Sequence, residues 1–136
     1  MRATSSRPLV CLWMVAAMNC GGESEPDLAL NLETLSVCQA AGQSVGSQVK
    51  VSGEFDGFGY ATNSTHVTVA TSELCNSNGA GLVFAELAND SEREKLYGHH
   101  PRNSRSGAPG DPVVVQGTIT RVREGRFTDI DGAVVR

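Results

Sequence analysis

Apolar residues follow three different patterns along this chain of 136 residues. Residues 8–18 form a continuous apolar run, and residues 32–42 place apolar side chains at helical spacing. From Val49 onward apolar and polar positions alternate. Helical spacing indicates a helix with one buried face, and alternation indicates a strand with one buried face. The pattern therefore predicts a leader, a short helix at 32–42 that buries Leu35 and Cys38, and a β-rich domain.

Alternation recurs in five segments, which are bounded by Gly, Asn, Pro and charged turn residues. The predicted strands are the segment from Val49, 65–71, 81–87, 112–123 and 126–135. A short helix is predicted within residues 89–98, because Asp90 or Ser91 is suited to begin it and Gly98 to end it. Residues 99–111 predict an unstructured loop.

Three strands, a short helix and two more strands are the order of elements in the oligonucleotide/oligosaccharide-binding (OB) fold. The pattern Val-x-Val-x-Gly occurs in both long strands, at residues 49–53 and 113–117. A glycine inside an alternating strand permits the sharp bend that a small barrel requires. We therefore expect structural roles for Gly53 and Gly117. The predicted fold class is mainly all-β: a five-stranded OB-like Greek-key barrel with one or two short helices, preceded by a signal peptide.

The first twenty residues have the layout of an export signal. Arg2 and Arg7 precede the apolar run, which is little more than half the length of about 20 residues that a membrane-spanning helix needs. The domain organisation predicted is a lipoprotein-type signal peptide at 1–19, an acidic flexible linker at 20–33 and the barrel domain at 34–136.

The end of the apolar run resembles a bacterial lipoprotein signal, in which a cysteine becomes the lipidated first residue of the mature chain. That residue is Cys20 here. The three residues before it, where such signals usually have Leu, a small residue and Gly or Ala, are Ala17, Met18 and Asn19. Gly21, in place of Asp, resembles lipoproteins sent to the outer membrane. The resemblance implies an exported protein, anchored to a membrane through lipid on the periplasmic side. The alternative is ordinary cleavage and release of a soluble protein.

Charge and cysteines add two expectations. The chain from Cys20 onward holds nine basic residues against fifteen acidic ones, a net charge of −6. Such a surface repels polyanions, so nucleic acid is predicted not to be a partner. If Cys20 carries lipid, Cys38 and Cys75 remain as an even pair in an oxidising compartment, and a disulfide between them is predicted.

Four stretches of this chain resemble a family of small exported bacterial OB-fold proteins related to the tRNA-anticodon-like group. They read SVCQ, VKVSGEFDGF, SELC and GLVFAEL, at 36–39, 49–58, 72–75 and 81–87. In that family a helix with a cysteine precedes the first strand and a second cysteine follows the second strand. The resemblance implies that Cys38 pairs with Cys75, and it implies fold and compartment but no reaction.

Aromatic residues supply the candidate ligand contacts. By alternation, Phe55, Phe84 and Phe127 are assigned to buried strand faces. Phe58 and Tyr60 fall in the connection between the first two strands, which OB folds commonly use for binding. They are the predicted ligand contacts, with a structural role in covering the mouth of the barrel as the alternative.

No catalytic residue, metal site or cofactor is predicted. The sequence has no Gly-x-Ser-x-Gly motif and no phosphate loop, and no recognised zinc spacing surrounds His66, His99 or His100. The function predicted is therefore a non-enzymatic binding module for a peptide, a glycan or an envelope protein. The alternatives are a metal-binding protein or metal-dependent enzyme that uses the loop histidines, and a structural accessory of the envelope.

Overall fold

The computed structural model describes residues 32–59 and 65–136, and one compact unit spans Glu33–Arg136. The predicted signal peptide, most of the predicted linker, Cys20 and Tyr60 lie outside the described residues. The elements of the described part are β1 (Thr34–Ser36), α2 (Val37–Ala40), β2 (Gln48–Phe58), β3 (His66–Asn76), β4 (Gly79–Leu87), α3 (Asp90–Glu94), β5 (Pro112–Arg123) and β6 (Phe127–Val135). No helix in these residues is long and apolar enough to cross a membrane.

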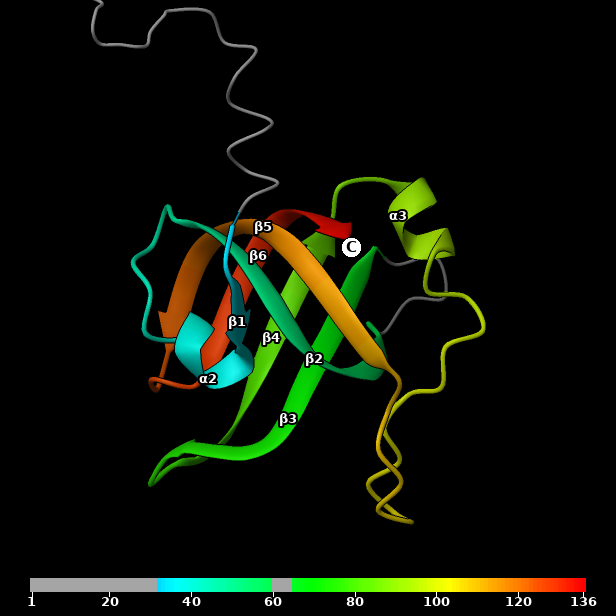
Figure 1. Ribbon diagram of the computed structural model, residues 1–136, viewed down its shortest axis with the longest axis horizontal. Helices are drawn as coiled ribbons and strands as arrows, with labels where there is room; N and C mark the ends of the chain where they lie inside the picture. Colours follow the sequence, from blue (N-terminus) through cyan, green and yellow to red (C-terminus); the bar gives the residue numbers. More distant parts are fainter. Residues whose placement is uncertain (1–31, 60–64) are drawn as a thin grey trace, which may run out of the picture. The chain divides into compact units, whose positions relative to one another are not determined.

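Five of the strands close into a barrel (Figure 1). β2, β3 and β4 form an antiparallel meander, β4 pairs in parallel with β6, and β6 pairs with β5. β5 then pairs with β2 and closes the sheet, while α3 lies between β4 and β5 in the chain. This is the strand order of an OB-like Greek-key barrel, so the predicted five-stranded barrel with two short helices is confirmed, whereas the signal peptide stays a prediction.

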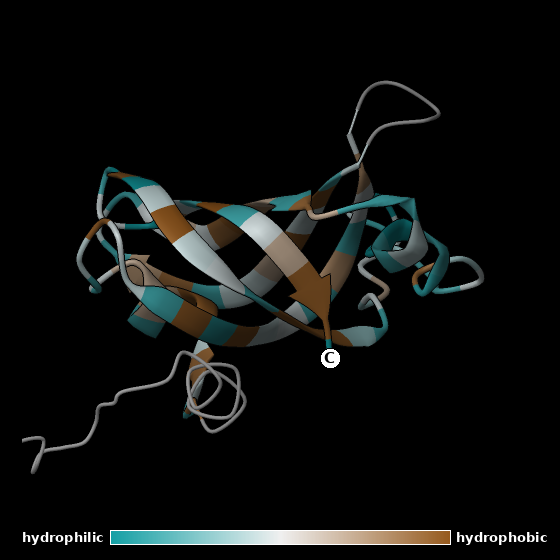
Figure 2. Ribbon diagram, turned by 90° about the horizontal axis from the view of Figure 1, so that it is seen from above, coloured by the Kyte–Doolittle hydropathy of each residue, from teal (hydrophilic) through white to brown (hydrophobic). Residues whose placement is uncertain are grey.

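The inside of the barrel is filled by small, mostly branched apolar side chains. Val51, Val69, Val83 and Val115 are completely buried, and Ile119, Ile130 and Leu96 complete the same core. Apolar and polar bands alternate along the strands, as a half-buried sheet requires (Figure 2). Valine suits such an interior because it is branched and compact.

The two copies of the Val-x-Val-x-Gly pattern pair with each other. In the antiparallel β2–β5 ladder, Val49 is opposite Gly117, Val51 opposite Val115 and Gly53 opposite Val113. A Cβ atom at Gly53 would lie 2.6 Å from Cγ1 of Val69, and one at Gly117 would lie 2.5 Å from Cγ2 of Ile130. Both glycines therefore leave room for a neighbouring strand to approach closely.

The predicted bends fall at slightly different places. The β5–β6 ladder changes register between Gln116 and Thr118, which is at Gly117. The β2–β3 ladder changes register between Phe55 and Gly57, beyond Gly53. Gly57 has a φ of 126°, which a residue with a side chain rarely adopts, so it permits the irregularity.

The predicted helix at 32–42 is wrong in its first half. Thr34–Ser36 instead form β1, which adds in parallel to residues 50–52 of β2. Ser36 ends this strand and caps α2: its hydroxyl accepts from the N–H of Gln39, whose side chain accepts from the N–H of Ser36. Val37 and Ala40 are the buried residues of α2, whereas Leu35 and Cys38 are only partly buried.

The predicted disulfide between Cys38 and Cys75 is confirmed. It joins α2 to the far end of β3, where β3 no longer pairs with β2 because their ladder ends at Glu54 and Ala70. The bond therefore links α2 to a part of β3 that is not paired with β2.

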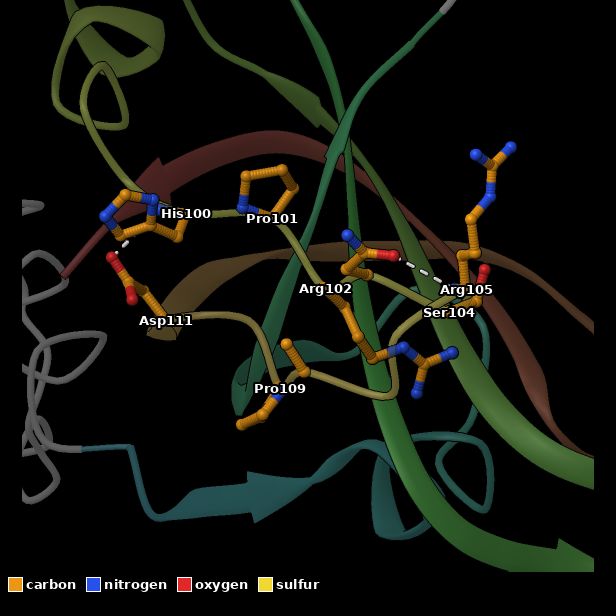
Figure 3. Close-up of a pocket in the computed structure, with 9 residues that line it drawn as sticks. His100, Pro101, Arg102, Ser104, Arg105, Pro109 and Asp111 are labelled. Carbon is orange, nitrogen blue, oxygen red and sulfur yellow. Dashed lines mark hydrogen bonds between the residues drawn. The ribbon is translucent and has the colours of Figure 1, made fainter.

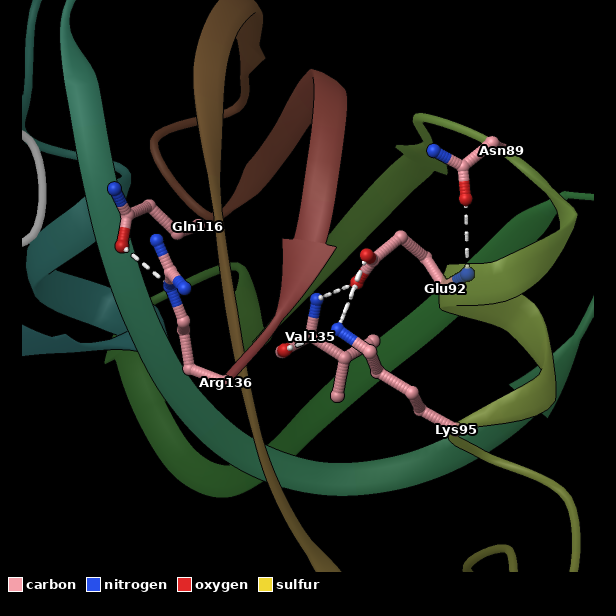
Figure 4. A network of polar contacts seen from close by, with 6 residues as sticks. All are labelled: Asn89, Glu92, Lys95, Gln116, Val135 and Arg136. Atoms are coloured by element: carbon pink, nitrogen blue, oxygen red, sulfur yellow. Dashed lines mark hydrogen bonds and ion pairs between the residues drawn. The ribbon is translucent and has the colours of Figure 1, made fainter. Parts of the chain in front are cut away.

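A polar network fastens α3 to the end of β6 (Figure 4). Asn89 caps α3, one residue before the predicted cap, by accepting from the N–H of Glu92. The Glu92 carboxylate accepts from the N–H of Val135 at 2.7 Å and from Nζ of Lys95 at 2.9 Å. Burial raises the pKa of Glu92, but these donors and the charges of Lys95 and Arg136 outweigh it and hold the pKa below its ordinary value.

Candidate functional site

The outer surface of the barrel carries two phenylalanine rings that the sequence assigned to its interior. On β4 the inward side chains are Val83, Ala85 and Leu87, so Phe84 points outward and is only half-buried. Phe127 on β6 is likewise half-buried. The two ring centroids are 6.0 Å apart at an interplanar angle of 61°. The prediction that these rings are buried is wrong. On β4 the smaller side chains of Val83 and Ala85 point into the barrel, and the larger side chain of Phe84 points outward.

Strand register explains which residues meet on this face. Leu82 of β4 is opposite Phe127 of β6, and Phe127 is opposite Arg123 of β5. Two residues further along, on the same face, Phe84 is opposite Asp129, and Asp129 is opposite Arg121. Each row crosses three strands, so side chains that are distant in the sequence become neighbours.

Arginine side chains cover the two rings. The guanidinium carbon of Arg123 lies 5.3 Å from the centroid of Phe84 and 5.5 Å from that of Phe127. That of Arg126 lies 4.0 Å from the centroid of Phe127, and its Nη1 donates to the carbonyl oxygen of Ala80. These distances are those of cation–π contacts. The rings and guanidinium groups together form a partly exposed platform.

The carboxylate of Asp129 binds two arginines of this face, Arg121 and Arg123. Asp129 accepts from Nε of Arg121 at 3.1 Å and from Nη2 of Arg123 at 2.9 Å. The Asp129 side chain is 24% exposed, whereas that of Arg121 is 63% exposed. Both of its oxygens are thus engaged by positive groups of the same face.

A groove of about 410 Å³ runs beside this platform. We call it the outer-face groove, and its lining residues are His66, Phe84, Glu86, Thr120, Arg123, Asp129, Ile130 and Asp131. Nε2 of His66 on β3 contacts one carboxylate oxygen of Glu86 on β4, and the second oxygen of Glu86 accepts from the hydroxyl of Thr65. The groove thus combines an aromatic ring, hydrogen-bond donors and carboxylate acceptors.

Phe58, one of the two predicted contact residues, belongs to a different cluster. Its ring lies 5.4 Å from that of Phe55 and 6.2 Å from that of Tyr97, and His99 packs against Phe55 at 6.2 Å. Phe58 is 36% exposed and Tyr97 is 57% exposed. Phe58 therefore lines an aromatic cluster beside α3 and takes no part in the outer-face groove. The predicted role of Tyr60 lies outside the described residues.

The predicted unstructured loop at 99–111 is instead folded on itself (Figure 3). The N–H of Asn103 donates to the carbonyl of Ala108, and its side-chain oxygen accepts from the N–H of Arg105. The loop lines a hollow of about 830 Å³, in which the N–H of His100 donates to Asp111 at 2.9 Å. The polar groups that order the loop are therefore largely bonded to one another.

Two backbone bonds also fasten this loop to β2. The N–H of Arg102 donates to the carbonyl of Phe55, and the N–H of Phe55 donates to the carbonyl of Asp111. Nε of Arg102 lies 3.5 Å from Oδ1 of Asp56. Burial raises the pKa of Asp56, and the nearby charge of Arg102 offsets this only in part.

The three histidines of the alternative metal hypothesis are not assembled into a site. His66 contacts Glu86 on the outer face, whereas His99 packs against Phe55. In residues 32–59 and 65–136, no group of three or more His, Cys, Asp or Glu side chains is arranged to hold a metal ion.

The sequence contains a signal for the outward direction of these two rings. In residues 81–87, Phe84 and Glu86 are two residues apart and therefore lie on the same face of the strand. The charge of Glu86 identifies that face as the outer one. In the last strand Phe127 shares its parity with Asp129 and Asp131. The ring positions could therefore have been assigned outward from their polar companions alone.

Comparison with known proteins finds no family model that matches the chain and no match among curated proteins. A solved structure from Klebsiella pneumoniae, described as a "putative nucleic acid-binding lipoprotein", is similar over 87% of this chain and 99% of its own, with 15% identity and a TM-score of 0.47. The strand pairings by themselves establish the barrel.

That description corrects one prediction. Nucleic acid was excluded as a partner on the net charge of the chain, and the description of the Klebsiella protein as nucleic acid-binding conflicts with this. Net charge averages over the whole surface, whereas three arginines gather at one place on the outer face: Arg121, Arg123 and Arg126. The exclusion of nucleic acid is therefore withdrawn.

Proposed function

We propose that this protein is a non-catalytic binding module that takes an extended glycan in the outer-face groove. In OB-like barrels the outer face of the second and third barrel strands is the face that binds oligonucleotides and oligosaccharides. Those strands are β3 and β4 here, and they contribute His66, Phe84 and Glu86 to the groove.

The observation that carries the proposal is the mixture of groups in the groove. Phe84 offers the edge of an apolar ring, Arg123 offers donors, and Glu86, Asp129 and Asp131 offer acceptors. A sugar ring presents an apolar face together with hydroxyl groups that both donate and accept hydrogen bonds. Binding sites of this kind place a few polar groups around an apolar surface.

We further propose that the module is exported and anchored through Cys20, and that it is not an enzyme. The first part is supported by the charged and apolar segments before Cys20, and the second by the lack of a nucleophile or phosphate-loop motif in the sequence. In the groove the carboxylate of Glu86 is paired with His66, and that of Asp129 is paired with Arg121 and Arg123. Carboxylates paired in this way suit a structural role.

The test is a binding screen of the purified mature protein against oligosaccharides, followed by titration calorimetry on the best ligand. Phe84→Ala should lower its affinity about tenfold, as removal of a central aromatic contact commonly does. Phe58→Ala is the matched control, because it removes an exposed ring outside the groove, and it should change the affinity less than about twofold.

Two outcomes would contradict the proposal. A loss of glycan binding in Phe58→Ala, with Phe84→Ala unaffected, would move the site to the aromatic cluster beside α3. Binding of a single-stranded oligonucleotide and of no glycan, with the same sensitivity to Phe84→Ala, would keep the face and replace the ligand.

A further inference from the structure

Two arginines of the outer face, Arg121 and Arg123, are already paired with a carboxylate of the protein itself. Arg121 and Arg123 come from one strand, and both donate to the carboxylate of Asp129 on the neighbouring strand. Arg123 also lies over both rings of the platform. If a ligand stacked on the rings carried an acidic group, that group would pair with the guanidinium groups of Arg121 and Arg123. Asp129 therefore already occupies the position that such a group would take.

An acidic ligand would have to displace this carboxylate, whereas an uncharged one would not. Displacement leaves Asp129, which is only 24% exposed, without its partners and beside a second negative charge. An uncharged sugar can instead bond to the remaining donors of Arg121 and Arg123 and leave both ion pairs intact, because a guanidinium has five N–H groups.

We propose that Asp129 is the specificity-determining residue of the face, and that it selects uncharged over acidic glycans. This inference rests on the proposed function, because it specifies the ligand class of the same groove. Asp131 offers an internal comparison. It lies two residues further along β6 and lines the same groove, but it is exposed and forms no ion pair or side-chain hydrogen bond with the described residues.

The experiment compares two probes with the same sugar backbone: a hexamer of galacturonic acid, which is acidic, and its fully methyl-esterified form, which is uncharged. Both are titrated against the mature wild-type protein, Asp129→Asn and Asp131→Asn. The two variants change the net charge equally on the same face, but only Asp129→Asn releases two guanidinium groups. Thermal melting of each variant verifies folding.

We expect Asp129→Asn to bind the acidic hexamer about tenfold more tightly than the wild type does, with the affinity for the ester changed less than about twofold. Asp131→Asn should strengthen acidic binding only about twofold, through the general change in charge. Adding Arg123→Gln to Asp129→Asn should remove most of the gain.

Equal gains in the two asparagine variants, or a parallel change for both probes, would overturn the role of Asp129 while leaving glycan binding in place. If the wild type binds neither probe and Asp129→Asn alone gains the acidic one, the role of Asp129 stands and the proposed function fails. If no protein in the series binds either probe, both fail.

Discussion

Removal of the Cys38–Cys75 disulfide should cost this barrel a large part of its stability. The variant to make is Cys38→Ala with Cys75→Ala, which removes both sulfurs and leaves no free thiol at either position. Cys75 lies on the part of β3 that has left β2, and Cys38 lies on α2. Neither residue is in the core, so the substitution itself opens little buried space.

The size of the effect follows from the sequence separation of 37 residues between the two cysteines. In the chain-entropy relation a closed loop of this length lowers the entropy of the unfolded chain by about 13 cal/mol/K, or about 4 kcal/mol at 25 °C. A domain of this size is typically stable by about 5–15 kcal/mol. The variant should therefore remain folded at room temperature but lose much of its margin.

Urea unfolding, followed by the fluorescence of the tyrosines or by circular dichroism, measures this directly. With a slope of about 2 kcal/mol/M, the midpoint should fall by about 2 M, and the slope should rise because the uncrosslinked chain unfolds further. Reductant should lower the midpoint of the wild type to that of the variant and leave the variant unchanged. A midpoint shift below about 0.5 M would refute the reasoning, since it would mean that the disulfide constrains the unfolded chain hardly at all.

Two further substitutions test the packing and the polar network. Glu92→Ala should destabilise the barrel by about 2 kcal/mol at pH 7, because the N–H of Val135 loses its charged acceptor, whereas Glu94→Ala, on the exposed side of α3, should have little effect in the same urea assay. Because the folded pKa of Glu92 lies below its ordinary value of 4.5, its contribution is complete above that pH and is lost as the pH falls through the lower folded pKa. The difference between wild type and Glu92→Ala should therefore shrink at pH 3, and an unchanged difference would contradict the ionic role. Gly117→Ala would place a Cβ 2.7 Å from the carbonyl oxygen of Asp131 and should destabilise by about 1–3 kcal/mol, whereas Gly42→Ala, with 3.5 Å to its nearest neighbour, should be tolerated in thermal melting; equal effects would show that Gly117 is not needed for close packing.

The barrel was predictable because each of its long strands has an alternating pattern within its own residues. The strand at 112–123 was predicted with the bounds that β5 has, since Val113, Val115, Gly117 and Ile119 alternate within a segment that begins at a proline and is followed by a Glu-Gly turn. The disulfide was predictable because Cys38 and Cys75 remain as an even pair if Cys20 carries lipid. The strand β1 was missed because its three residues owe their conformation to backbone bonds with β2, and no local pattern records such a partner.

The groove was not predictable to the same degree. Two of its lining residues, Phe84 and Asp129, meet because they are opposite each other on neighbouring strands, and that position depends on strand register. Register follows from the pairing of whole strands and is not written in any one of them. Phe58 was predicted as a ligand contact because OB folds commonly bind ligands through the connection between the first two strands. Its ring instead packs with that of Tyr97 in a cluster away from the groove.

The pairing of the two Val-x-Val-x-Gly segments also sets the order in which the fold can close. Val51 and Val115 are opposite each other across the seam that closes the barrel, although 64 residues separate them. The meander of β2, β3 and β4 pairs strands that are neighbours in the sequence, whereas the pairing of β2 with β5 must close a much longer loop. Until β5 pairs, the edge of β2 that faces it carries unpaired backbone groups, and such an edge is a template for pairing with another chain. The partly folded protein is therefore most vulnerable to aggregation before the seam closes.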